Sequence, residues 1–177
     1  MEADELKELR ERAEHEEHRP VAFTMSLMAV LVAVTTVLGH RSHTDAVLFQ
    51  NKATDQWNEY QAKRIRSNDT ALVADLMNVV TISDKDAAQR IEKVYADHQT
   101  KWAADLKEES EKAEALEKGV ERAEKRAVRF DLAEALLEIG LVITSVTLLT
   151  HKLTYWYFGM FFSAAGVISA ASAYFLG

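Results

Sequence analysis

The fold class is decided by residues 153–176, which read LTYWYFGMFFSAAGVISAASAYFL. This stretch contains no charged residue, and about 20 apolar residues in a helix cross the roughly 30 Å hydrocarbon core of a bilayer. It opens with Tyr155, Trp156 and Tyr157, whose amphipathic rings favour the headgroup level. The stretch predicts a membrane-spanning helix and places the chain among integral membrane proteins.

Small residues recur along this predicted span at four-residue steps, as in the pairs Gly159 and Ser163 or Gly166 and Ala170. Such spacing lets helix backbones approach closely in lipid. We interpret these four residues as a helix-packing surface. The alternative is that small residues are merely common in such helices.

A first span is predicted over residues 20–39, because Val21–Leu38 carries no charge and Pro20 suits the first turn of a helix. A cleavable signal peptide is the rival interpretation. The run is long for one, the residues before it are acidic, and Gly39–Arg41 does not form a small-residue cleavage site.

A second span is predicted over residues 132–150, although Glu134 and Glu138 lower its apolar character. Only a short connection near residues 151–154 separates it from the third span. A connection of this length favours an immediate return through the membrane.

Residues 40–131, between the first two spans, predict a long helical hairpin outside the membrane. No glycine or proline lies between His40 and Lys118, so the strongest helix breakers are absent there. Ser83 and Asp86 have the spacing of a capping box, which predicts a new helix after a turn near residues 81–83. Each arm would reach roughly 60–70 Å at 1.5 Å per residue.

The return arm carries a narrow apolar seam with charged flanks, typical of a coiled coil. Two helices with so thin a seam bury little apolar area, so a homo-oligomer is expected. The expected fold is all-α, with an acidic N-terminal tail over residues 1–19, three transmembrane helices and an antiparallel hairpin. The predicted seam consists of Ile91, Val94, His98, Trp102, Leu106, Ala113, Leu116, Val120, Ala123 and Ala127.

Composition excludes several classes of function. The chain has 177 residues and a net charge of −7, with eight acidic against four basic residues in positions 1–20, so nucleic acid is not an expected partner. It has no cysteine, which rules out disulfides and thiolate metal sites. No phosphate loop or nucleophile elbow occurs, so we expect neither an enzyme nor a cofactor.

The polar residues of the second span are the candidate functional site. Asp131, Glu134, Glu138 and Ser145 fall on one helix face because their spacings are three, four and seven. A carboxylate in hydrocarbon costs from about 2.5 kcal/mol upward, so these groups should face protein or water. In a symmetric oligomer this acidic stripe could line a cation pathway.

Structural pairing is the alternative role for these carboxylates. The first span ends at the membrane level where the second begins, so His40, Arg41 and His43 are expected close to Asp131 and Glu134. Glu138 lies one turn deeper, and there we expect Thr35 and Thr36 opposite it rather than a base. Glu138 is therefore the carboxylate that pairing explains least well.

Two histidine pairs flank the first span, His15 with His18 and His40 with His43. Their spacing could place two imidazoles on one metal ion. Most such pairs at a membrane surface are solvated or hydrogen-bonded, so no metal site is predicted.

The orientation in the membrane has two opposing indications. Four basic residues precede the first span and two follow it shortly, which favours a cytoplasmic N-terminus and a hairpin outside. The many basic residues of the hairpin favour the reverse, but long segments translocate regardless of charge. We favour the first orientation.

Three segments resemble a known family: GHRSHTDAVLFQNKATDQWNEYQAK at 39–63, FDLAEALLEIGLVITSVTLLT at 130–150 and YWYFG at 155–159. The family is a bacterial membrane-protein family called domain of unknown function 4337. The likeness covers Pro20 to the C-terminus, with Asp55–Lys63 its most specific part. The resemblance implies a bacterial inner-membrane protein with three spans, and it implies no activity.

Two functions are therefore expected as competitors. The first is a homo-oligomeric cation channel or pore, with lipid, cations and other copies of the chain as its partners. The second is a membrane-anchored scaffold whose hairpin binds a partner and whose carboxylates only hold helices together.

Overall fold

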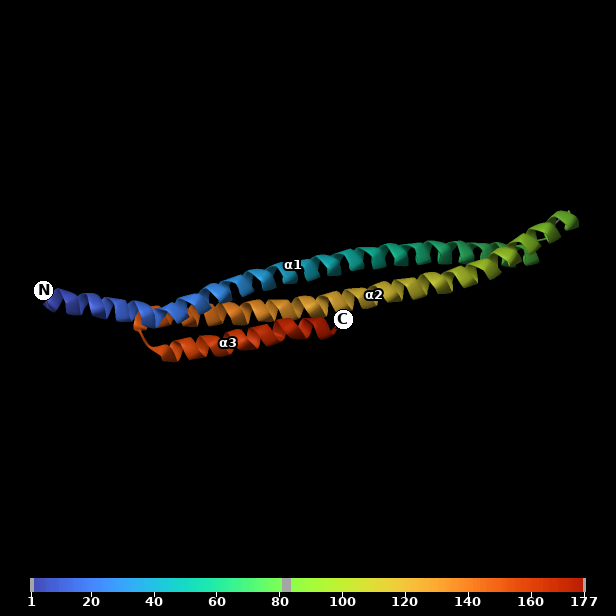
Figure 1. Ribbon diagram of the computed structural model, residues 1–177. Coiled ribbons are helices and arrows are strands. Elements are labelled where there is room, and N and C mark those ends of the chain that lie inside the picture. Colours follow the sequence, from blue (N-terminus) through green and yellow to red (C-terminus); the bar gives the residue numbers. More distant parts are fainter. Residues whose placement is uncertain (1, 81–83, 177) are drawn as a thin grey trace. The chain divides into compact units, whose positions relative to one another are not determined.

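The computed structural model describes residues 2–80 and 84–176, and the side chains of residues 19–80 and 84–175. The described chain is helical, in the order α1 (Glu2–Val79), α2 (Lys85–Thr150), α3 (Leu153–Ser172) and the short 3₁₀ helix η1 (Ala173–Leu176) (Figure 1). No strand occurs among these residues, which confirms the all-α prediction. Three helices are long and apolar enough to cross a membrane.

Helix α1 includes the residues predicted as an N-terminal tail. It begins at Glu2 and continues through Pro20, so the prediction that Pro20 occupies a first helical turn is wrong. Residues 2–19 are mostly Glu, Arg, Lys, Leu and Ala, which are strong helix formers. Their combined propensity favours a helix that runs into the apolar stretch despite one proline.

Helix α2 begins after Asp84, whose carboxylate accepts a hydrogen bond from the backbone N–H of Ala87 at 2.9 Å. Asp84 therefore performs the capping that the sequence analysis assigned to Ser83. Ser83 itself lies outside the described residues.

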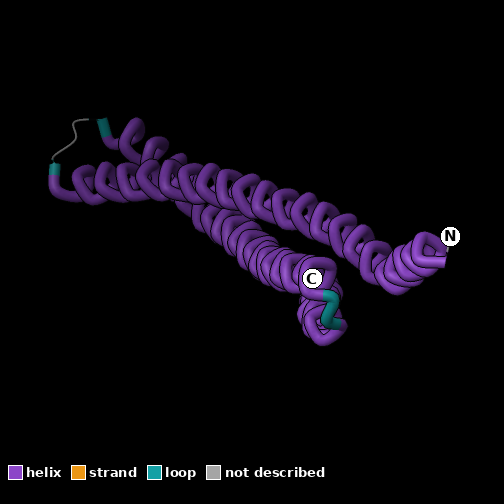
Figure 2. Tube along the Cα trace, turned by 90° about the vertical axis from the view of Figure 1, so that its left-hand side faces the viewer, coloured by secondary structure: helices purple, strands orange, loops and turns teal. Residues whose placement is uncertain are grey.

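The connection between α2 and α3 consists of His151 and Lys152, and it appears as a short loop in Figure 2. His151 has φ 54°, a left-handed conformation that ends α2 abruptly. Two residues are enough to reverse the direction of the chain between the two helices. The short connection after residues 132–150 predicted this immediate return.

The chain divides into two compact units. The bundle unit comprises residues 1–44 and 122–177, and the two-helix unit comprises residues 45–121. In the bundle unit, residues at steps of three and four, most of them small, form the buried face of α2, against buried residues of α1 and α3. The buried residues of α2 there are Ala123, Ala127, Phe130, Ala133, Leu137, Gly140, Thr144 and Thr147.

In the two-helix unit, α1 and α2 contact each other in antiparallel order. The ring of Phe49 covers Gly119, and the ammonium of Lys63 reaches Glu109. Of the predicted seam residues of this unit, Ala113 and Val120 are buried, and Trp102, Leu106 and Leu116 are half-buried. Ile91, Val94 and His98 are exposed, so the described part of α1 does not cover the predicted seam over that stretch.

Candidate functional site

The four predicted stripe residues project from one side of α2 in the bundle unit. Asp131, Glu138 and Ser145 are exposed and Glu134 is half-buried. The hydroxyl of Ser145 donates to the backbone oxygen of Val142 at 2.7 Å, which satisfies its proton within the helix. The three carboxylates differ in what surrounds them.

Asp131 is held by His43 of α1. The Nε2 atom of His43 lies 3.0 Å from Oδ2 of Asp131, and both side chains are about half exposed, at 54% and 51%. Gly39 of α1 lies beside this pair, and a Cβ at this position would lie 3.3 Å from Oδ1 of Asp131. Among the described residues, no such contact joins His40 or Arg41 to the stripe.

Glu134 is held by a hydroxyl rather than by a base. Oγ1 of Thr36 lies 2.6 Å from Oε1 of Glu134 and donates to it, a geometry typical of a charge-assisted bond. The same hydroxyl lies 2.9 Å from the backbone oxygen of Val32, the usual alternative acceptor for threonine in a helix. Thr36 was expected opposite Glu138, and this expectation is wrong by one helical turn.

Glu138 has no partner among the described residues. Two contacts bracket it: Thr36 with Glu134, and Met28 with Thr144, where Oγ1 lies 3.8 Å from the sulfur. The stretch of α1 between these contacts, residues 29–35, is AVLVAVT, and the hydroxyl of Thr35, its one polar side chain, donates to the backbone oxygens of Leu31 and Val32 rather than to Glu138. Glu138 is thus a carboxylate on an exposed face, within an apolar stretch, and no residue that the structure describes compensates it.

The predicted packing residues of α3 lie against α2. Gly159, Ser163 and Gly166 are buried and Ala170 is half-buried. A Cβ at Gly159 would lie 2.7 Å from the backbone oxygen of Gly140, and one at Gly166 would lie 2.9 Å from the backbone oxygen of Ala133. The two helix backbones approach so closely that only glycine fits at these crossings.

Two polar contacts add to this packing within the bundle unit. The hydroxyl of Ser169 donates to the backbone oxygen of Arg129 on α2 at 3.0 Å. The indole N–H of Trp156 donates to Oγ1 of Thr24 on α1, also at 3.0 Å. Helix α3 is therefore tied to both other helices, which fixes the face that α2 leaves exposed.

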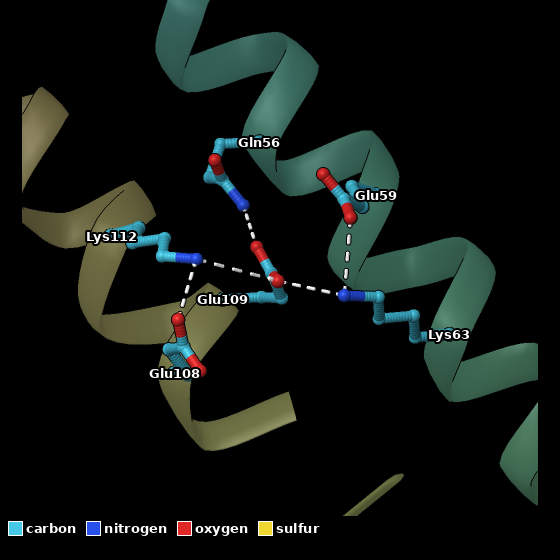
Figure 3. A network of polar contacts seen from close by, with 6 residues as sticks. All are labelled: Gln56, Glu59, Lys63, Glu108, Glu109 and Lys112. Carbon is cyan, nitrogen blue, oxygen red and sulfur yellow. Dashed lines mark hydrogen bonds and ion pairs between the residues drawn. The ribbon is translucent and has the colours of Figure 1, made fainter. Parts of the chain in front are cut away.

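The two-helix unit contains a polar network that was not expected from the sequence (Figure 3). Its centre is Glu109, whose side chain is only 8% exposed and lies 2.7 Å from the ammonium of Lys63. The amide of Gln56 donates to the other carboxylate oxygen, and Lys112 lies 3.7 Å away. The Lys63 ammonium also binds Glu59 at 3.1 Å, and so joins two carboxylates.

These contacts shift the titration of the network. The hydrogen bond from Lys63 holds the pKa of Glu109 below its ordinary value, against the opposing effect of burial. The hydrogen bonds to Glu109 and Glu59 raise the pKa of Lys63. The pKa of Lys112 is raised mainly by its hydrogen bond to Glu108. The charged forms of all three groups are therefore favoured at neutral pH.

Glu109 could have been found from the sequence, because the list of predicted seam residues lacks a member between Leu106 and Ala113. Leu106 and Ala113 are seven residues apart, and regular spacing requires a seam residue at 109 or 110 between them. A glutamate at such a position calls for a basic partner on the facing helix, and Lys63 is that partner. Polar groups in a coiled-coil seam characteristically fix its register.

We predict that Glu109→Gln lowers the thermal unfolding midpoint of the full-length protein in detergent by several degrees at pH 7. The pKa of Glu109 is depressed on folding, so its contribution is present above the ordinary value of 4.5 and is lost as the pH falls below it. The difference between wild type and variant should therefore shrink in acid.

The matched control is Glu111→Gln, because Glu111 is exposed and its one ion-pair partner among the described residues is Lys107, at 3.9 Å. Circular dichroism against temperature, repeated over a pH series, makes the comparison. A deficit for Glu109→Gln that stays constant from pH 7 to pH 3 would contradict the assignment of a charged, network-bound Glu109.

No group of three or more potential metal ligands lies together among the residues whose side chains are described. His40 and His43 are among those residues, whereas the side chains of His15 and His18 lie outside them. The part of the chain that the structure describes thus offers no grouped metal ligands.

The fold and these sites define an all-helical protein with three helices of membrane-crossing length and an acidic stripe on the second. The chain belongs to the family described as Domain of unknown function (DUF4337), which matches residues 17–176. No curated protein and no solved structure matches the chain significantly. Family membership agrees with the resemblance in the sequence and adds no activity.

Proposed function

We propose that the chain forms a homo-oligomeric membrane assembly in which the exposed face of α2 lines a path for cations. Glu138 is the single observation that carries this proposal, because none of the described side chains of its own chain compensates it. A carboxylate facing lipid would cost from about 2.5 kcal/mol upward, and that cost is avoided if Glu138 faces water or a polar group of a neighbouring copy.

The chemistry of this face suits a cation. Glu138 lies six residues past Leu132, which is about 9 Å along the helix at 1.5 Å per residue. Ser145 lies on the same face two turns further on and adds a hydroxyl oxygen. Repeated around a symmetry axis, these groups form an oxygen-lined ring that can replace part of a cation's hydration shell.

The two outer carboxylates fit the entrance of such a path. Asp131 is half exposed although it binds His43, and Glu134 accepts its hydrogen bond from a neutral hydroxyl. Both carboxylates therefore contribute negative potential near one end of the span. Such potential attracts cations and raises their local concentration.

The test is cation flux through purified protein in liposomes. We expect flux with the wild type, and we expect it to be lost in Glu138→Gln while the helical content stays unchanged. The control is Glu124→Gln, which removes the same charge from α2 outside residues 132–150 and should conduct. Absence of flux in the wild type, or equal flux in Glu138→Gln, rejects the cation path.

One observation favours a second function, a membrane-anchored interaction scaffold. Two of the three carboxylates already have partners in the chain, as expected of groups that hold helices together. A scaffold predicts that proximity labelling from the two-helix unit returns one dominant partner protein. Recovery of the chain's own copies alone would count against it.

The proposed location is the bacterial inner membrane, with the N-terminus in the cytoplasm and residues 40–131 forming a hairpin on the other side. Its support is the family resemblance and the basic residues before the first span. Antiparallel contacts within the two-helix unit are consistent with such a hairpin.

A further inference from the structure

The exposed face of α2 in the bundle unit has a regular composition along its length. Its central residues follow one another at alternating steps of three and four, so they form one row along the helix. Apolar and polar residues alternate within this row, which we call the α2 row. The α2 row consists of Val128, Asp131, Ala135, Glu138, Val142, Ser145 and Leu149, all of which are exposed.

Two apolar residues of the α2 row have a polar residue on each side. Ala135 lies between Asp131 and Glu138, and its side chain is a single methyl group. Val142 lies between Glu138 and Ser145, and its isopropyl group is bulkier and has restricted rotation about χ1. The side chain of Val142 is also largely uncovered by the described chain, because the residue is 63% exposed.

We infer that Val142 forms the hydrophobic constriction of the proposed cation path, where the passage of ions is controlled. The inference rests on the proposed function, because it requires that the exposed face of α2 line a water-filled path. At about 1.5 Å per residue, Val142 lies about 6 Å from Glu138 and about 4.5 Å from Ser145 along the helix axis. The constriction is therefore one apolar layer with an oxygen-bearing layer on each side.

Charge favours Val142, rather than the carboxylates, as the narrowest point of the path. Equivalent carboxylates of neighbouring copies repel each other, so the layers of Asp131 and Glu138 stay apart and hold water or cations. Uncharged isopropyl groups do not repel each other, and a narrow apolar layer expels its water. An ion that crosses such a layer loses hydration without gaining oxygen ligands, so the layer sets the barrier to conduction.

Other exposed apolar residues of α2 fit this role less well. Leu132 and Ile139 each directly follow a carboxylate of the row, so their side chains project about 100° around the helix from it. Leu148 and Leu149 lie in the last turn of α2, where the path would open to water. Val142 combines high exposure with a position inside the predicted span and in line with the polar residues.

Cation flux through the full-length protein in liposomes tests the constriction with two substitutions of opposite effect. Val142→Thr keeps the branched shape and adds a hydroxyl that holds water, so we expect flux to rise roughly tenfold, which corresponds to a barrier lower by about 1.4 kcal/mol. Val142→Leu enlarges the apolar layer, so we expect flux to fall below that of the wild type. Because the position is exposed, the helical content should stay unchanged in both variants.

The matched controls are Val30→Thr and Val30→Leu, because Val30 is 60% exposed and lies on α1 rather than in the α2 row. Both should conduct like the wild type. Adding Glu138→Gln to Val142→Thr should abolish flux, because the ions still need the carboxylate layer. Flux that persists in this double variant would be leakage and would overturn the inference.

Two outcomes separate the constriction from the proposed function on which it rests. Flux in the wild type that is equal in Val142→Thr and Val142→Leu overturns the constriction and leaves the cation path in place. Absence of flux in the wild type and in Val142→Thr alike rejects the cation path, and the constriction with it.

Discussion

Gly159→Ala is expected to destabilise the bundle unit by about 1–3 kcal/mol, the usual cost of overpacking a close contact. A Cβ at Gly159 would lie 2.7 Å from the backbone oxygen of Gly140 and 3.1 Å from Cβ of Thr144. A backbone oxygen cannot rotate away as a flexible side chain can, so α3 has to move away from α2. That movement would also loosen Ser163 and Gly166, which share the crossing.

Gly39→Ala is the matched control, because it makes the same chemical change within a helix of the same unit. Its nearest neighbours would be Oδ1 of Asp131 at 3.3 Å and Cβ of Phe130 at 3.5 Å, and the carboxylate can turn aside. The better helix propensity of alanine is worth up to about 1 kcal/mol, so this variant should be neutral or slightly stabilised.

The free energies of unfolding of both variants would be compared in mixed micelles, with circular dichroism as the measure of unfolding. Packing is a sensitive readout in a membrane because lipid is as apolar as the protein interior, so helix association depends on close fit and hydrogen bonds. Equal stability of Gly159→Ala and Gly39→Ala would show that the crossing between α2 and α3 is looser than these distances require.

The positions of the helices could be predicted because long uncharged runs and helix breakers are properties of short stretches of sequence. The end of α2 and the start of α3 were located to within a few residues in this way. Capping depends on finer geometry. Asp84 and Ser83 are adjacent residues of equal capping preference, and the hydrogen bond from Ala87 to Asp84 could not be predicted from that preference alone.

The environment of the carboxylates could be predicted only in part. His43 contacts Asp131 because they lie at adjoining ends of the first two predicted spans, and counting residues along the sequence is enough to locate those ends. The depth of Thr36 relative to Glu134 and Glu138 depends on the relative shift of two helices along their axes. A shift of one turn moves a hydroxyl from one carboxylate to the next, and sequence patterns do not determine it.

The apolar residues beyond Tyr60 show a further limit of periodicity. Ile65, Leu72 and Leu76 have the spacing of a buried seam, yet they are exposed in the described chain. Spacing predicts that a face is apolar, but it does not say which helix covers that face. The same limit applies to Ile91 and Val94, which were expected in the seam and are exposed.

The central claim is that α2 crosses the bilayer and carries Glu138 into it. Accessibility of single cysteines to a membrane-impermeant maleimide in sealed vesicles tests this most directly, because the chain has no cysteine of its own. Suitable positions are Glu5 before the first predicted span, Lys101 in the two-helix unit and Lys152 in the connection between α2 and α3.

A cysteine on the outer side of a sealed vesicle reacts at once, whereas one on the inner side reacts only after the membrane is opened with detergent. This makes the expected difference all-or-none. If α1 and α2 each cross once, Glu5→Cys and Lys152→Cys will react from the same side and Lys101→Cys from the opposite side. Reaction of Lys152→Cys from the same side as Lys101→Cys would contradict the account, because α2 would then not cross.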